Sequence, residues 1–214
     1  RIGTLLFPYR PGKRTMTPDH ATNLLLVSIA FNNAQTIVLQ YGYLKKYLQD
    51  RYSYVVADNS NDKVVSAEIR TFCIRHGIPY YKLPSNPLTG IHPSGSHGLA
   101  MNWAYGHIVK KHAPSYAGFL DHDIFPYTET AIVPHIRHAM FGLIQERNDK
   151  WYLWPGFCFF EYNMLKGKDI NFMPAPDLDT GGANYNSLYA QTDKDDLEQL
   201  RHCYRNLATH EEST

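Results

Sequence analysis

Apolar positions follow two alternating patterns along the first 120 residues. Four short apolar runs are typical of strands buried on both faces: 24–30, 52–57, 78–83 and 116–120. Between them, three stretches repeat apolar residues every three or four positions, as amphipathic helices do: 35–49, 65–77 and 99–108. The alternation predicts an α/β fold with a mostly parallel central sheet and helices on both of its faces.

The pattern is less regular on either side of this unit. Residues 1–22 are rich in proline and basic residues and predict an irregular N-terminal arm before a single domain over 23–214. Downstream we expect a helix over 129–145 and a polar helix over 193–205. An aromatic run between them, 151–160, is interrupted by Pro155-Gly156, and 174–185 has the composition of a loop.

Polar clusters follow three of the four predicted strands. Asn32-Asn33 comes after the first strand, 58–62 after the second and 121–123 after the fourth. Ligands bind at the carboxyl ends of the strands in parallel sheets, so these clusters predict a binding site.

The cluster Asp121-His122-Asp123 places two carboxylates at the end of a buried strand. Carboxylate oxygens suit hard cations, so the motif predicts a Mg²⁺ or Mn²⁺ site that would neutralise a bound diphosphate. The alternative is a pair of solvated acids in a turn, because Asp-x-Asp is a common tripeptide.

Composition narrows the class of protein. A formal net charge of +1 gives no field that favours nucleic acid, and three dispersed cysteines do not indicate a disulfide scaffold. The chain has no Asn-x-Ser/Thr sequon, no signal-peptide-like stretch and no apolar run that could span a membrane. These features favour a cytoplasmic protein, including one held at the periphery of a membrane.

Four landmarks resemble glycosyltransferase family 2-like proteins, which have the GT-A fold with its Rossmann-like sheet. They occur in the family's order: Val27-Ser28-Ile29-Ala30-Phe31-Asn32, Val55-Val56-Ala57-Asp58-Asn59-Ser60, Gly98-x-x-x-Asn102 and Phe119-Leu120-Asp121-His122-Asp123. The resemblance covers about residues 23 to 160. It implies a metal-dependent transferase that moves a sugar from a nucleotide-diphosphate sugar to a hydroxyl acceptor, in a glycan, a lipid or a protein-linked sugar.

The resemblance also implies roles for particular positions. It divides the domain into a nucleotide-sugar-binding half, 23–128, and an acceptor-side half, 129–214. Asp121 and Asp123 correspond to the ligands of Mn²⁺ or Mg²⁺. The expected donor-binding residues are Ala30, Phe31, Asn32, Asp58, His97, Asn102 and Asp121.

On the acceptor side the resemblance is weaker. A carboxylate that deprotonates the acceptor hydroxyl would come from Asp179, Asp177 or Glu161. Trp154, Gly181 and Gly182 are candidates for acceptor binding, since sugar faces stack on aromatic rings and glycine allows close approach of the backbone. The family's common acidic pair is not evident here, so the base and the anomeric outcome stay open.

Other functions compete with this hypothesis. A phosphohydrolase of the haloacid dehalogenase type also uses Asp-x-Asp after a strand, normally the first strand of its domain. A nucleotidyltransferase would need a basic, glycine-rich loop after the first strand, where this chain has Phe31-Asn32-Asn33. A non-catalytic sugar-binding module needs no metal. The sequence does not specify the nucleotide, the sugar, the acceptor or the oligomeric state.

Overall fold

The computed structural model describes residues 24–198, 204–206 and 211–213. The predicted strand–helix alternation is confirmed in its first part. The elements in chain order are β1 (Leu24–Ala30), α2 (Ala34–Tyr47), β2 (Tyr52–Asp58), α3 (Lys63–Arg75), β3 (Tyr80–Lys82), α4 (Pro93–Ala104), a π-helical segment (Tyr105–Val109), α5 (Lys110–His112) and β4 (Tyr116–Asp121). The predicted arm, 1–22, lies outside the described residues.

The central sheet has six strands in the order β3-β2-β1-β4-β6-β5. The first four are parallel, whereas β6 (Lys150–Glu161) runs antiparallel to β4 and pairs with β5 (Met140–Arg147). Short helical pieces complete this part: 3₁₀ turns Val133–His135, Gly182–Asn184 and Lys194–Asp196, helix α6 (Tyr162–Leu165) and a π-helical turn Tyr185–Tyr189. A separate two-stranded sheet joins β7 (Tyr204–Asn206) and β8 (Glu211–Ser213). The predicted α/β fold with a mostly parallel sheet is confirmed.

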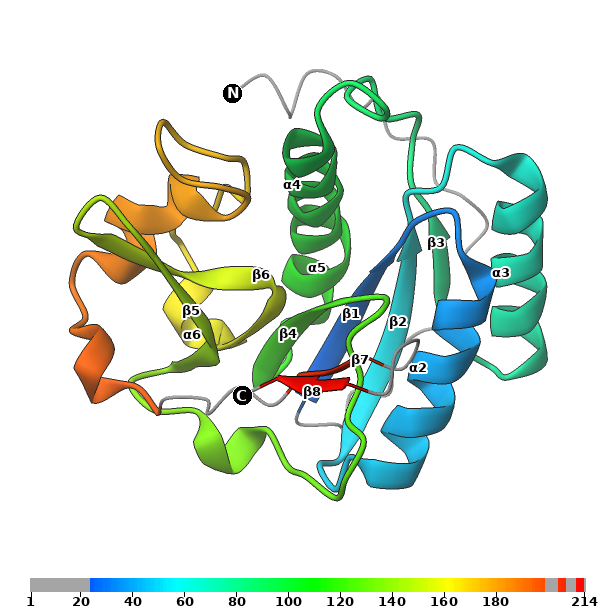
Figure 1. Ribbon diagram of the computed structural model, residues 1–214, viewed down its shortest axis with the longest axis horizontal. Helices are drawn as coiled ribbons and strands as arrows, with labels where there is room; N and C mark the ends of the chain where they lie inside the picture. The colour runs from blue at the N-terminus through cyan, green and yellow to red at the C-terminus, as the bar shows by residue number, and fades with distance from the viewer. Residues whose placement is uncertain (1–23, 199–203, 207–210, 214) are drawn as a thin grey trace.

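Helices cover both faces of the sheet, as predicted. Leu24 and Leu26 of β1 belong to a core that includes residues of α2 and α3, whereas Leu25 and Val27 belong to a core with residues of α4. In Figure 1, α2 and α3 lie side by side and α4 stands on the other side of β1 and β2. Alternate side chains of one strand therefore serve two cores, which explains why the strands are continuous apolar runs.

The predicted helix over 129–145 is wrong. Pro134 cannot donate an internal helical hydrogen bond, and this segment forms only a 3₁₀ turn before β5 begins at Met140. His138 and Ala139 have φ values of 47° and 65°, and Arg137 and Met140 exchange backbone hydrogen bonds around them. A turn with two left-handed residues ends any helix. The residues that follow, from Met140, then form strand β5 by pairing with β6.

The aromatic run forms one strand, 150–161, with an irregularity at the Pro155-Gly156 interruption. One further prediction in this half needs correction. The polar helix predicted over 193–205 is absent from the described part of that range, which has a 3₁₀ turn at 194–196 and a strand at 204–206. Pairing of that strand with 211–213 overrides local propensity.

β4 passes very close to β6 at Gly118, so a side chain at this position should lower the stability of the fold. A Cβ atom at Gly118 would lie 2.2 Å from Cδ1 of the buried Phe159 ring. We expect Gly118→Ala to lower the free energy of unfolding by about 1–3 kcal/mol through overpacking. Gly42→Ala, in the middle of α2 with nothing within 4 Å of the added carbon, should raise it by about 0.5–1 kcal/mol. Urea unfolding of both variants measures the difference, and equal stability of the two would contradict the packing argument.

Candidate functional site

The strand register brings the predicted polar clusters to one edge of the sheet. β1 lies between β2 and β4, with Ala30 opposite Asp58 and Ile29 opposite Asp121. Since neighbouring strands are about 4.8 Å apart, Asp58 and Asp121 sit on backbones separated by roughly 10 Å. The loops after these three strands therefore form a common edge where a ligand could bind.

Asp58 turns inward at this edge. Its carboxylate is fully buried and accepts hydrogen bonds from the Ser60 backbone amide (2.9 Å) and the Tyr80 hydroxyl (2.7 Å), as well as from the hydroxyl of Ser66. The Lys82 ammonium lies 3.3 Å from Oδ2. Burial alone raises the pKa of Asp58, but these hydrogen bonds and the lysine charge outweigh it and hold the pKa below its ordinary value. In this structure the Asp58 carboxylate holds the loop after β2 by these hydrogen bonds. Its direct contact with a nucleotide sugar stays a prediction.

Asn32 joins the loops that follow β1 and β2. Its backbone is left-handed (φ 47°), and its amide donates to the Ser60 hydroxyl at 2.8 Å. Its side-chain oxygen accepts from the amides of Asn61 and Asp62, both at 3.1 Å. Of the other predicted donor residues here, Ala30 is buried, whereas Phe31 is 38% exposed. Only Phe31 offers an accessible ring for stacking at the end of β1.

Asp121 is paired with a histidine from α4. His97 Nε2 lies 3.1 Å from Asp121 Oδ1, and both side chains are about a quarter exposed. Burial raises the pKa of Asp121. The charge and hydrogen bond of His97 lower it, and the charge of His122 has a smaller effect in the same direction. Together they outweigh burial, so the pKa of Asp121 lies below its ordinary value. His122 itself contacts the Ile29 carbonyl oxygen through Nδ1 at 3.1 Å. Asp121 is therefore held as a carboxylate, with His97 as its direct partner.

A bulge in β6 shapes the other side of Asp121. The β5–β6 register changes between Gly142, opposite Cys158, and Ile144, opposite Leu153, so residues 154–157 contain extra chain. A Cβ atom at Gly156 would lie 2.6 Å from Asp121 Oδ2 and 2.4 Å from the Trp154 indole. The half-buried Trp154 ring and the Asp121 carboxylate thus border the same space, which exists only because residue 156 has no side chain.

The Asp-x-Asp turn fits a metal that shares its ligands with a substrate. Asp123 is exposed, and Asp121 is held ionised. Within 24–198, no group of three or more His, Cys, Asp or Glu residues is arranged to hold a cation. Mg²⁺ is commonly bound by one or two carboxylates, with substrate phosphates and water completing the shell. Asp121 and Asp123 match that donor set, provided that a diphosphate supplies the remaining ligands.

Asn102 links α4 to the segment around Asn171 and Phe172. Its amide nitrogen donates to Asn171 Oδ1 at 2.9 Å, and its amide oxygen accepts from the Phe172 backbone at 2.7 Å. Asn184 Oδ1 accepts from the Asn171 backbone at 2.7 Å, which continues the chain of amides. Gly98 allows this contact, because a Cβ there would lie 2.6 Å from the Phe172 carbonyl oxygen. Both ends of the Asn102 side chain serve this connection, and its donor-binding role stays a prediction.

Asp179 approaches the first turn of the same helix. Thr180 donates its hydroxyl to the Ser94 carbonyl oxygen at 3.0 Å, and its backbone amide donates to Asp179 Oδ1 at 2.7 Å. Burial raises the pKa of the Asp179 carboxyl, but hydrogen bonds from the Ser94 side chain and from Thr180 bring it below the ordinary value. Asp179 is exposed, and the next residue, Thr180, connects this segment to the N-terminal end of α4.

The two residues after Thr180 are glycine for different local reasons. Gly181 is left-handed (φ 86°), and its amide donates to the Phe172 carbonyl at 2.8 Å. An added Cβ would be 3.7 Å from Pro155 in the β6 bulge. Gly182 has no room for a side chain, because a Cβ would meet Leu178 Cβ at 2.3 Å. Gly181 therefore packs beside the bulge that carries Trp154, while Gly182 is required by local packing.

The other two candidate bases are placed differently. Asp177 is exposed on the turn between Ala175 and Leu178, with φ 66°. Glu161 pairs with Tyr116, the first residue of β4, whereas Asp121 is the last. Five residues of strand separate those ends by about 17 Å. The structure does not bring Glu161 to the edge that carries Asp121.

Gln40 is a site residue that the sequence analysis missed. It is fully buried in α2, and its amide nitrogen donates to the carbonyl oxygens of Asp121 (2.7 Å) and Ile124 (2.6 Å). A signal was present, because Gln40 lies three residues after Ile37 and four before Leu44, on the buried stripe of the helix. A polar residue on such a stripe needs a buried partner.

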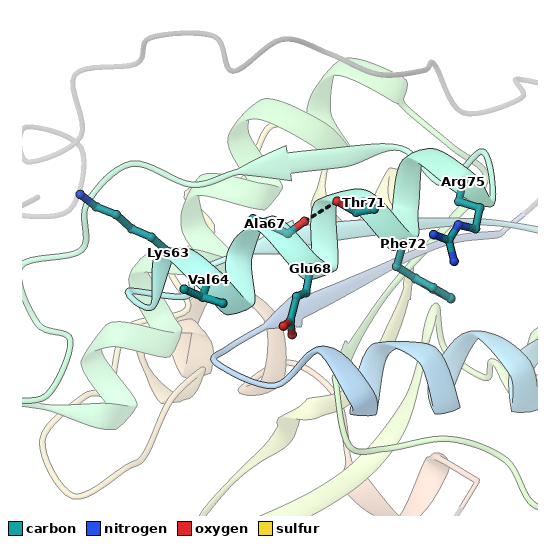
Figure 2. A pocket seen from close by; sticks show the side chains of 7 residues that line it. All are labelled: Lys63, Val64, Ala67, Glu68, Thr71, Phe72 and Arg75. Atoms are coloured by element: carbon teal, nitrogen blue, oxygen red, sulfur yellow. Dashed lines mark hydrogen bonds between the residues drawn. The ribbon is translucent and has the colours of Figure 1, made fainter.

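A hollow away from these strand ends lies along the outside of α3. Figure 2 shows the side chains of Val64, Ala67 and Phe72 there, with Lys63 and Arg75 toward the two ends of the helix. The hollow includes none of the predicted site residues.

Among the described residues, every helix is too short or too polar to cross a membrane.

Comparisons with known proteins find matches among solved structures and none among family models or curated sequences. No protein-family model matches the chain, and no curated protein sequence matches it. Solved structures that resemble it include the mannosyltransferase PcManGT from Pyrobaculum calidifontis in complex with GDP-Man and Mn²⁺ (TM-score 0.47, 13% identity, 75% of this chain and 49% of that one). Others are TarS from S. aureus (0.45, 17%, 72% and 32%) and a mannosyltransferase from S. cerevisiae (0.46, 8%, 76% and 62%).

This chain spans less than two thirds of each of those proteins. At such low identities and TM-scores below 0.5, the matches transfer neither activity nor ligands to it.

The buried Asp58 carboxylate makes stability depend on pH. We expect Asp58→Asn to cost about 1–3 kcal/mol at pH 7, because an amide cannot accept all the hydrogen bonds that converge there. The folded-state pKa is depressed below the unfolded value of about 3.9. The charge-dependent stabilisation is therefore present above that value and is lost as the pH falls through the folded pKa.

Urea unfolding of both proteins between pH 7 and pH 3 should show the difference narrowing toward acid. Asp149→Asn is a matched control, because Asp149 is exposed and its φ of 59° suits asparagine. A difference for Asp58→Asn that stays constant with pH would contradict the assignment.

Proposed function

We propose that this protein is a glycosyltransferase that moves a sugar from a nucleotide-diphosphate sugar to a hydroxyl acceptor. One observation carries the proposal: a single turn of α4 contacts Asp121 and the segment that carries Asp179. His97 pairs with Asp121, and the Ser94 carbonyl oxygen, three residues earlier, accepts a hydrogen bond from Thr180, whose amide donates to Asp179. Residues three apart are neighbours on a helix, so Asp121 and the Asp179-Thr180 segment meet the same helical turn.

Transfer between two bound molecules requires such a pair of sites. On the donor side, Asp121 and Asp123 would hold Mg²⁺ or Mn²⁺ together with the diphosphate. When bound, the cation supplies neutralisation of the charge on the departing nucleoside diphosphate. Phe31, exposed at the end of β1, would stack on the nucleotide base, and His97 would keep Asp121 ionised and in place.

On the acceptor side, Asp179 would accept the proton of the attacking hydroxyl. Like any aspartate with an ordinary pKa of about 3.9, Asp179 is a carboxylate near neutral pH, which is the form a general base needs. The Trp154 ring borders the space beside Asp121, and Gly181 packs against the neighbouring Pro155. These residues would form the wall on which an acceptor sugar rests.

Donor binding can be tested before the substrate is known. We expect one nucleoside-diphosphate sugar in a panel, with Mn²⁺ present, to raise the melting temperature of the wild-type protein. At a ligand concentration about 100 times Kd, mass action gives a shift of about 5–10 °C for a chain of this length. Asp123→Ala should remove the Mn²⁺-dependent part of the shift, because it removes one of the two carboxylates.

Two results would contradict metal-dependent donor binding. One is the absence of any shift with nucleoside diphosphates or their sugars. The other is a shift that persists without metal and in Asp123→Ala, which would favour a sugar-binding module. Hydrolysis of p-nitrophenyl phosphate by the wild-type protein would favour a phosphohydrolase.

The role of Asp179 is separable from donor binding. Asp179→Asn should leave the donor-induced shift intact and lower kcat for transfer by about 100-fold or more, because the amide cannot accept the hydroxyl proton. Asp177→Asn is the matched control, since Asp177 lies two residues away on an exposed turn and should retain activity. Equal losses in the two variants would exclude Asp179 as the specific base.

A further inference from the structure

Gln40 connects α2 to the turn that carries both predicted metal ligands. The turn runs from Asp121 to Ile124, whose amide donates to the Asp121 carbonyl at 3.0 Å. Gln40 Nε2 donates one hydrogen to the carbonyl of each of these two residues, at 2.7 and 2.6 Å. One planar amide group therefore fixes the first and last carbonyls of a turn that contains His122 and Asp123.

Tyr54 fixes the orientation of that amide. Its hydroxyl donates to Gln40 Oε1 at 2.7 Å, and its side chain is buried in β2. An amide turned over would direct its oxygen at two carbonyl oxygens, which cannot donate. The contacts at both ends of the side chain thus favour one orientation.

The burial of the group makes the connection specific. Gln40 and Tyr54 are 0% and 6% exposed, so water does not readily replace either partner. Without the Gln40 donor, the Asp121 carbonyl would keep the Ile124 amide as a partner, whereas the Ile124 carbonyl would lose its bond to Gln40. Leaving a buried acceptor unpaired costs more than the hydrogen bond contributed. The turn would then have to move the Ile124 carbonyl toward solvent, and the carboxylates of Asp121 and Asp123 would move with it.

We propose that Gln40 is a positioning residue for the sugar-transfer reaction, whose amide fixes the turn on which Asp121 and Asp123 stand. Tyr54 supports Gln40 in this role from β2. The inference rests on the proposed function, since positioning has a catalytic consequence only if these carboxylates take part in transfer. Its physical part, the restraint of the turn, is measurable without any substrate.

Gln40→Met tests the restraint, because methionine keeps the length of the side chain and removes both donors. We expect hydrogen exchange in peptides covering 119–127 to accelerate about tenfold or more, while exchange in β2 and α3 is unchanged. For transfer, kcat should fall by about tenfold and the KM for the acceptor should stay the same. A residue that only stabilised the fold would lower the melting temperature without this division between kcat and KM.

Two further variants complete the experiment. Gln49→Leu is the control, because Gln49 is exposed and lies just beyond the C-terminal end of α2. This variant should match the wild-type protein in both measurements. Tyr54→Phe keeps the Gln40 donors and the ring but frees the amide, so smaller changes of about threefold are expected in the same peptides and in kcat. If Gln40→Met does not fold, Tyr54→Phe decides by these two measurements.

The outcomes separate the two proposals. Unchanged exchange over 119–127, or faster exchange with unchanged kcat, would overturn the positioning role of Gln40. If the wild-type protein transfers no sugar from any donor, the proposed function fails. The exchange measurement still decides in that case whether Gln40 restrains the turn.

Discussion

The contact between α4 and the two acid-bearing segments is the constraint on which the candidate site depends. The helix packs on the face of the sheet formed by Leu25 and Val27, which sets its position relative to the strand ends. From there His97 reaches Asp121 on β4, and the backbone of Ser94 accepts a hydrogen bond from Thr180. A shift of α4 would therefore change both halves of the site together. The rigidity of the helix replaces a covalent link between segments about 60 residues apart in the chain.

Glycine allows the close approaches that this arrangement requires. At Gly98 the helix touches the Phe172 backbone, and at Gly156 the β6 bulge leaves space for the Asp121 carboxylate and the Trp154 ring. Neither glycine is needed for an unusual φ value, and neither has room for a methyl group. Packing density, rather than backbone freedom, explains why these positions carry no side chain.

Buried polar groups define the edge of the sheet as much as the exposed acids do. Asp58 uses its carboxylate to hold the loop after β2, and Gln40 uses its amide to hold the turn after β4. Both residues lie behind the surface that a ligand would meet. Each is hydrogen-bonded through both ends of its polar group, as burial requires.

The sequence by itself determined the parallel part of the fold and the strand ends at which polar residues gather. It could do so because strands buried on both faces and amphipathic helices leave strong local patterns. The β5–β6 hairpin was missed. Its conformation before Met140, at His138 and Ala139, and at the Pro155 bulge depends on pairing between strands and not on local sequence preference.

Only the tertiary structure decided where each candidate acid lies relative to the strand ends. Register placed Glu161 at the far end of β4, and burial turned Asp58 inward. The packing of α4 against the sheet brought its N-terminal end into contact with Asp121 and with Thr180, the residue after Asp179. Those outcomes depend on contacts between residues far apart in the chain, which no local pattern encodes.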